Sequence, residues 1–88
     1  MANLFILTVI TPDKIVYQGK AVSLIAPAAL GYLGVLANHA PLAANLTKGK
    51  IIIKEESGNT VNFYSAEKGF LRVFRNNVTL LLDRVGPG

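Results

Sequence analysis

Few side chains of this chain could take part in catalysis, and they lie apart in the sequence. There is one histidine, His39, and no cysteine. A histidine acts as a general base or metal ligand when a carboxylate or further ligands lie close by, and zinc takes several nitrogen or sulfur ligands. His39 is flanked by Asn38 and Ala40, with no acidic residue near it in the sequence. We expect a turn histidine whose ring hydrogen-bonds to the backbone.

The carboxylates and hydroxyls form no visible catalytic group either. Glu55 and Glu56 are adjacent, so in a strand they would point to opposite faces and could not cooperate as an acid–base pair. The serines have no neighbouring base that would activate them as nucleophiles. The sequence therefore predicts no catalytic residue, no metal site and no cofactor.

Two closely spaced glycines, Gly31 and Gly34, match the loose pattern GxxG, which in one RNA-binding module clamps single strands. There is no basic residue between them, so we expect instead a tight turn or a close approach of the backbone. Tyr32 lies between the two glycines, and we expect its side chain to be displayed to a partner. Most of the other aromatic residues lie in strand-like segments and are expected in the core.

A long uncharged run surrounds these residues. From Ala21 to Thr47 there is no Lys, Arg, Asp or Glu. A charge is costly to bury without a partner, so such a run usually contacts protein or lipid. Pro27, Pro41 and several other breakers interrupt it, and in a bilayer each freed backbone group would need an internal partner. We therefore expect contact with protein.

Composition bounds the answer further. The 88 residues fit one domain, 51% of them are hydrophobic, and the charged fraction of 16% is below the roughly 25% typical of soluble domains. The net charge of +4 could suit nucleic acid, but the nine basic residues are scattered and form no run. A small β-barrel that binds single-stranded nucleic acid remains the alternative hypothesis, motivated by the charge and the aromatic residues.

Gly, Pro and Asn recur at short intervals, which favours strands over helices. The first strand is expected over 4–10 and reads as covered on both faces. The second is expected over 20–26, ending before Pro27. We expect short strands and turns in the central region, and no long helix anywhere.

Two hairpins give the clearest local signal. Strands at 50–55 and 60–65 flank Ser57-Gly58-Asn59, and Val61 and Phe63 should share the buried face. Strands at 70–75 and 78–82 flank Asn76-Asn77, since Asn tolerates the left-handed backbone that a two-residue turn needs. The predicted fold is all-β, a small antiparallel β-sandwich. We place the domain at residues 1–85 and treat 86–88 as a tail or an added remnant.

Three ordered segments resemble the epsilon subunit of F-type ATP synthases. They are Leu7 to Lys14 followed by Tyr17-Gln18-Gly19, then Gly31 to Leu42, then Lys68 to Val73 followed by Asn77 to Leu81. The resemblance implies a β-sandwich domain of the central rotor that performs no chemistry itself. It would dock on the gamma subunit and on the ring of c subunits, and help couple proton or sodium flow to ATP synthesis.

The resemblance also suggests which residues make these contacts. The loop facing the c-ring would comprise Gly31, Tyr32, Leu33 and Gly34. For gamma we expect the residues that follow, namely Val35, Leu36, His39, Pro41 and Leu42.

Location and assembly follow from the same resemblance. The protein would lie at the cytoplasmic face of a bacterial inner membrane as a peripheral subunit, touching the membrane only indirectly through the c-ring. It would bind no nucleic acid and be a monomer when isolated. Many relatives continue into a helical pair that inhibits hydrolysis and in some binds ATP. This chain stops at Gly88, so we expect neither an ATP site nor that switch here.

Overall fold

The computed structural model describes residues 3–87, and within them the chain forms strands joined by turns, with no helix. Val, Ile and Leu are frequent in these segments, which suits the half-buried surface of a pleated sheet. The strands are β1 (Phe5–Ile10), β2 (Ile15–Ala28), β3 (Gly31–Leu36), β4 (Leu42–Leu46), β5 (Gly49–Glu55), β6 (Thr60–Ser65), β7 (Gly69–Phe74), β8 (Asn77–Leu82) and β9 (Val85–Pro87).

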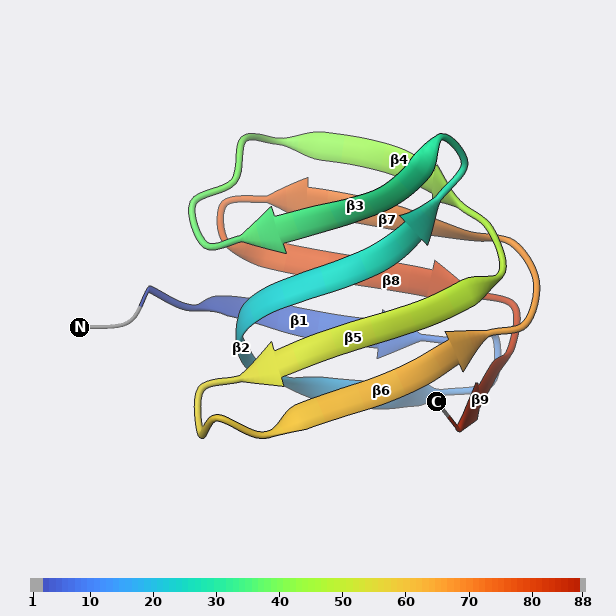
Figure 1. Cartoon of the computed structure of the whole chain (residues 1–88), viewed down its shortest axis with the longest axis horizontal. Coiled ribbons are helices and arrows are strands. Elements are labelled where there is room, and N and C mark those ends of the chain that lie inside the picture. Colours follow the sequence, from blue (N-terminus) through green and yellow to red (C-terminus); the bar gives the residue numbers. More distant parts are fainter. Residues whose placement is uncertain (1–2, 88) are drawn as a thin grey trace.

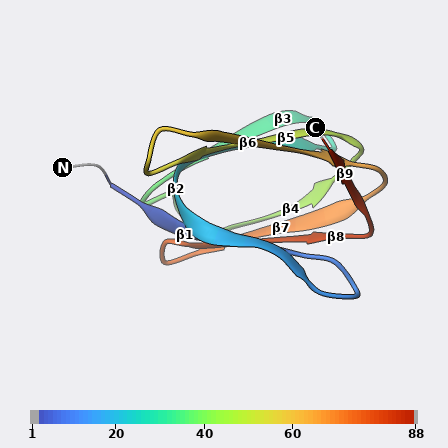
Figure 2. The same cartoon turned by 90° about the horizontal axis from the view of Figure 1, so that it is seen from below.

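The strands form two layers that face each other. Strands β3, β5, β6 and the later part of β2 make the front layer of Figure 1, and β1, β4, β7 and β8 lie behind it. Figure 2 shows the layers from below, with β2 passing from one to the other. The early part of β2 pairs with β1 and its later part pairs with β3 and β5. One continuous strand thus joins both layers.

The core fills the space between the layers. Successive side chains of a strand point to opposite faces, so every second residue enters the core. Strand β8 shows this directly, because Val78, Leu80 and Leu82 are buried while Leu81 is exposed. The buried apolar side chains from the other strands are Phe5, Leu7, Val9, Ala21, Leu24, Ala26, Val35, Leu46, Ile51, Ile53, Leu71 and Val73.

These observations confirm the predicted all-β sandwich. The pairs are antiparallel with one exception, since β1 runs parallel to β8. The prediction that the first strand is covered on both faces was wrong. Ile6 points outward from β1 and is 45% exposed, because only the alternate positions of that strand reach the core.

Strand β2 continues past Pro27, where the sequence predicted an end. Pro27 pairs with Tyr32 of β3, and its carbonyl accepts a hydrogen bond from the Thr47 N–H at 2.8 Å. The N–H and C=O of one strand residue point to the same side. The missing N–H of Pro27 therefore falls on the side where pairing with β5 has already ended, at Ile25. The proline costs the ladder no bond with β5.

Both predicted hairpins are confirmed, with one turn shifted by a residue. The β5–β6 turn contains Gly58 at φ 94°, as the Ser-Gly-Asn signal indicated. In the β7–β8 hairpin, Phe74 pairs with Asn77, so the turn residues are Arg75 and Asn76, at φ 50° and 59°. Two positive φ values define the primed turn that hairpins favour. The turn was predicted at Asn76-Asn77.

The chain end differs from the predicted boundary at residue 85. Val85, Gly86 and Pro87 form β9, which pairs with β6 from Ser65 to Phe63. Gly86 and Pro87 are therefore part of the sheet and not a separate tail. Gly88 lies outside the described residues.

Candidate docking surfaces

Strand β3 carries most of the predicted contact residues, and its alternation divides them. Tyr32 and Leu36 point outward and are 63% and 64% exposed. Leu33 is half-buried, and Val35 is fully buried with 0% exposed. The prediction of Val35 as a gamma contact was wrong, because its side chain packs in the core between the layers. Residues predicted as one continuous segment therefore present different surfaces.

The predicted turn around Gly31 and Gly34 is instead a strand. The turn lies at Ala29 and Leu30, and Leu30 is the most exposed large hydrophobic residue of the described part of the chain. Gly31 has φ 132°, which favours glycine where the chain leaves that turn. A side chain built at Gly34 would meet nothing within 4 Å. Gly34 is thus a bare position on the outer face, not a close approach of the backbone.

Tyr32 is exposed but held in place. Its hydroxyl accepts a hydrogen bond from the Lys50 N–H at 3.3 Å. The side chain reaches across Pro27 of β2 to Gly49, at the start of β5. A Cβ on Gly49 would lie 2.9 Å from the Tyr32 Oη and 2.8 Å from the Pro27 Cβ. The absence of a side chain at Gly49 makes room for the tyrosine.

Apolar side chains adjoin Gly34 on the outer face of the front layer. Ile25 of β2 pairs with Gly34 on one side and with Ile52 of β5 on the other. Tyr32 and Leu36 lie two residues to either side of Gly34 along β3. We call this surface the front patch: Ile25, Tyr32, Gly34, Leu36 and Ile52. The exposed side chains of Ile25, Tyr32 and Leu36 are available to a protein partner, and Ile52 beside them is half-buried.

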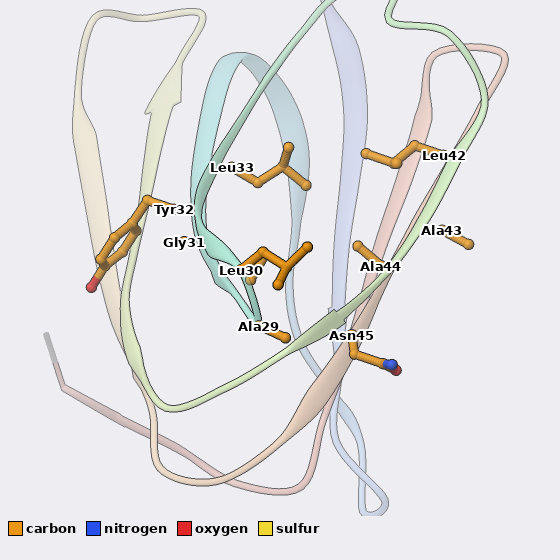
Figure 3. A pocket seen from close by; sticks show the side chains of 10 residues that line it. Ala29, Leu30, Gly31, Tyr32, Leu33, Leu42, Ala43, Ala44 and Asn45 are labelled. Carbon is orange, nitrogen blue, oxygen red and sulfur yellow. The ribbon is translucent and has the colours of Figure 1, made fainter.

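A groove opens where β3 and β4 face each other across the edge of the sandwich. Its volume is about 570 Å³. Figure 3 shows Leu33 and Leu42 at one part of the groove and Leu30 and Ala44 at another, while Tyr32 points away toward β5. Leu33 and Leu42 were predicted as contacts of different partners. The structure brings them to the same groove.

The loop between β3 and β4, residues 37–41, carries the remaining predicted residues. His39 is half-buried, Pro41 is exposed, and the His39 Nδ1 lies 2.8 Å from the Ala40 carbonyl oxygen. This confirms the expectation of a turn histidine bonded to the backbone. The loop follows the last residue of β3, whereas Tyr32 is the second residue of that strand.

The titratable groups of the described residues do not gather into a reactive cluster. Within 3–87, no three side chains of His, Asp or Glu approach closely enough to hold a metal ion. The Tyr17 hydroxyl donates a hydrogen bond to the Glu55 carboxylate. Burial, this hydrogen bond and the negative charge of Glu55 raise the pKa of Tyr17 to about 12. The pair joins β2 to β5. The Tyr17 ring packs edge-on against the Phe63 ring, with 5.9 Å between the ring centroids.

The sequence prediction placed too many aromatic residues in the core. Phe5 is buried, but Tyr64, Phe70 and Phe74 point outward and are exposed. The missed members of the front patch are Ile25 and Ile52. Their signal was available, because 24–26 and 51–53 are apolar at consecutive positions, and a strand can bury only one of two alternating sets unless both faces are covered.

Taken together, the fold and these surfaces define a small all-β sandwich that presents apolar side chains on its outer faces and along one open edge. Among the described residues there is no apolar helix of the length needed to cross a bilayer.

Comparison with known proteins identifies the family. The profile of the family described as "ATP synthase, Delta/Epsilon chain, beta-sandwich domain" matches residues 4–88. The chain therefore belongs to this family, as the resemblance indicated. It is 40% identical over 82 residues to an ATP synthase epsilon chain of Leptospira interrogans, covering 93% of this chain and 63% of that protein. It is 41% identical over 80 residues to a chloroplastic ATP synthase epsilon chain of Emiliania huxleyi, covering 91% of this chain and 60% of that protein.

Solved structures agree on the fold. A chain in the mitochondrial ATP synthase of Euglena gracilis, a structure of OSCP, F1 and c-ring, superimposes with a TM-score of 0.89 at 23% identity, over 96% of this chain and 53% of that one. A chain in a structure of the central stalk and c-ring of the Tetrahymena thermophila mitochondrial ATP synthase superimposes with a TM-score of 0.76 at 17% identity. The match covers 93% of this chain and 65% of that one. This chain thus spans about three fifths of the length of the curated relatives it matches.

Proposed function

We propose that this chain is the β-sandwich domain of a non-catalytic central-stalk subunit in a proton- or sodium-translocating ATP synthase. It would dock on the gamma subunit and on the c-ring and so help couple ion flow to ATP synthesis. The observation that carries the proposal is family membership over residues 4–88, with relatives named ATP synthase epsilon chain at 40–42% identity. The comparisons give no support to the nucleic-acid alternative.

We divide the exposed groups between two neighbouring contacts, which meet at the groove where Leu33 and Leu42 both lie. Gly31, Tyr32, Leu33 and Gly34 occupy the part of β3 next to the β2–β3 turn, and we assign them to the c-ring. Tyr32 is the anchor of this set, since aromatic residues held in one orientation often dominate interfaces.

The gamma contact would lie toward the other end of β3. We assign to it Leu36, His39, Pro41 and Leu42, and omit the buried Val35. Tyr32 and Leu36 are four residues apart, which in a strand is roughly 13 Å. That separation gives two partners room to bind side by side.

The setting follows from the same proposal. The domain would be peripheral at the cytoplasmic face of a bacterial inner membrane and reach the membrane only through the c-ring. It would carry no cofactor and be a monomer when isolated. Binding through Tyr32 would depend on salt less than an ionic contact does, because added salt screens charges and not apolar contacts.

Assembly with purified c-ring and gamma tests the proposal. We expect Tyr32→Asp to weaken c-ring association at least about tenfold, the size of a hot-spot loss, while the melting temperature changes little. Tyr64→Asp is the matched control, because Tyr64 also points outward from the front layer and is exposed. The proposal fails if the wild-type chain binds neither gamma nor c-ring, or if both variants behave alike.

A further inference from the structure

Two asparagines that are 38 residues apart are joined by a reciprocal pair of hydrogen bonds. The Asn38 backbone N–H donates to the Asn76 Oδ1 at 2.6 Å, and the Asn76 Nδ2 donates to the Asn38 Oδ1 at 3.0 Å. Both polar atoms of the Asn76 side chain are thus used on a single residue. A flipped amide would place two donors together at the first contact and two acceptors at the second. The pair therefore has one favourable orientation.

Asn76 also ties the same place to a third segment. Its backbone carbonyl accepts the Ile6 N–H at 2.9 Å, where β1 runs beside β8. The loop 37–41, the β7–β8 turn and the start of β1 therefore meet at one residue. The loop and the turn lie at the same end of the sandwich in Figure 1.

The backbone conformations of both asparagines suit this role. Asn38 has φ 63° and Asn76 has φ 59°, in the left-handed region that most residues avoid. Asn is among the few residues other than glycine that adopt this region readily. Glycine would permit the same backbone but would supply no amide. An asparagine at each position provides both the conformation and the hydrogen bonds.

We infer that Asn76 is a positioning residue that holds the loop 37–41 in the orientation needed for docking. The inference rests on the proposed function for what the loop contacts, namely the gamma subunit. The loop carries His39 and Pro41, and the hydrogen bond of the His39 ring to Ala40 stays within the loop. The amide pair fixes the loop to the body of the sandwich. A loop held in its bound orientation loses less conformational entropy on binding than a mobile one.

The test removes the amide and keeps the backbone. Asn76→Gly retains a residue that tolerates positive φ and loses both side-chain bonds. Asn38→Asp is the conservative variant, because its carboxylate still accepts from the Asn76 Nδ2 and its backbone N–H is unchanged. Asn77→Ala is the matched control in the same hairpin, since Asn77 is exposed and its side chain bonds the Arg75 carbonyl, not the loop.

Amide hydrogen exchange and gamma affinity are measured for all four proteins. In Asn76→Gly we expect exchange at the Asn38 amide, corrected for intrinsic rate, to rise at least about fivefold, while exchange at the core amide of Leu80 changes by less than about twofold. We expect gamma to bind this variant several-fold more weakly. Asn38→Asp and Asn77→Ala should stay within about twofold of wild type in Asn38 exchange.

The outcomes separate the two claims. Unchanged Asn38 exchange in Asn76→Gly overturns the inference, because the amide pair then does not hold the loop. Faster exchange with unchanged gamma affinity also overturns it, since the held orientation would then not matter for docking. If wild type binds no gamma, the proposed function is lost and the positioning role with it, while the exchange data still show whether the amide pair fixes the loop.

Discussion

The hydroxyl of Tyr32 in β3 accepts the backbone N–H of Lys50 in β5 at 3.3 Å, reaching across the strand between them. An exposed tyrosine would ordinarily sample several rotamers. Here its hydroxyl is bonded and its ring passes over Pro27 and Gly49. A partner that binds this side chain meets an aromatic surface whose orientation is already set, which lowers the entropy cost of association.

This arrangement makes Gly49 sensitive to substitution. We expect Gly49→Ala to destabilise the fold by about 1–3 kcal/mol, because the new Cβ would lie 2.8 Å from the Pro27 Cβ at φ 153°. It would also displace the Tyr32 hydroxyl. Urea denaturation measures the stability, and the Lys50 amide shift reports the displaced hydroxyl. Gly34→Ala is the control, since a Cβ there meets open space; equal losses in both variants would contradict the argument.

The Tyr17–Glu55 pair predicts an alkaline limit to stability. The pKa of Tyr17 is raised to about 12 in the folded chain, against 10.0 for the unperturbed group. Between these pH values the folded state binds more protons than the unfolded state, so the free energy of unfolding falls as pH rises. The contribution is fully present below pH 10 and is lost as pH passes 12. Denaturation curves measured from pH 8 to pH 12 check this.

Tyr17→Phe isolates that contribution from other alkaline titrations. The variant should lose stability at pH 8, because the hydrogen bond to Glu55 is gone. Its stability should also decline less steeply than wild type above pH 10. A wild-type profile parallel to that of the variant over the whole range would show that Tyr17 does not titrate as stated.

Truncating two adjacent residues of β3 should change the free energy of unfolding by very different amounts. Val35 is fully buried and Leu36 is 64% exposed. We expect Val35→Ala to cost about 1–3 kcal/mol of stability, because it removes buried methyl groups and leaves a cavity. Leu36→Ala should stay within about 0.5 kcal/mol. Thermal or chemical denaturation of the two variants decides between them, and similar costs would mean that the alternation of β3 is misassigned.

A charge on the front patch should act on binding and not on folding. Leu36→Glu places a carboxylate on an exposed position, so stability should change by less than about 1 kcal/mol. If Leu36 contacts gamma, the carboxylate must be desolvated there, and affinity should fall at least about tenfold. Leu81→Glu, on the outer face of the back layer, is the control. Calorimetry with purified gamma measures the affinity of both variants. Equal affinities would show that Leu36 does not contact gamma.

Much of the fold was accessible from local patterns. The β5–β6 hairpin was predictable because Gly58 marks the turn and the flanking strands alternate clearly. The turn of the β7–β8 hairpin was misplaced by one residue, although the pattern contained the answer. Val73 and Val78 both face the core and pair with each other. Four residues separate them, so Phe74 must pair with Asn77 and leave Arg75 and Asn76 to turn.

Other features depended on tertiary structure. The sequence around Pro27 could not show that β2 continues through this residue. That outcome depends on where β5 stops pairing with β2. The assignment of Val35 as a contact came from treating a continuous segment as a continuous surface, which a strand is not. The pair of Asn38 and Asn76 links two turns distant in sequence, and a single sequence without a fold brings no such residues together.

Strand β2 belongs to both layers, and this has a mechanical meaning. Two sheets held only by side-chain packing can slide over one another under load. Here the polypeptide itself crosses between them, so sliding would have to stretch covalent chain or break hydrogen bonds along one strand. In the proposed role, such a body would pass a twisting force from one bound neighbour to another with little internal deformation.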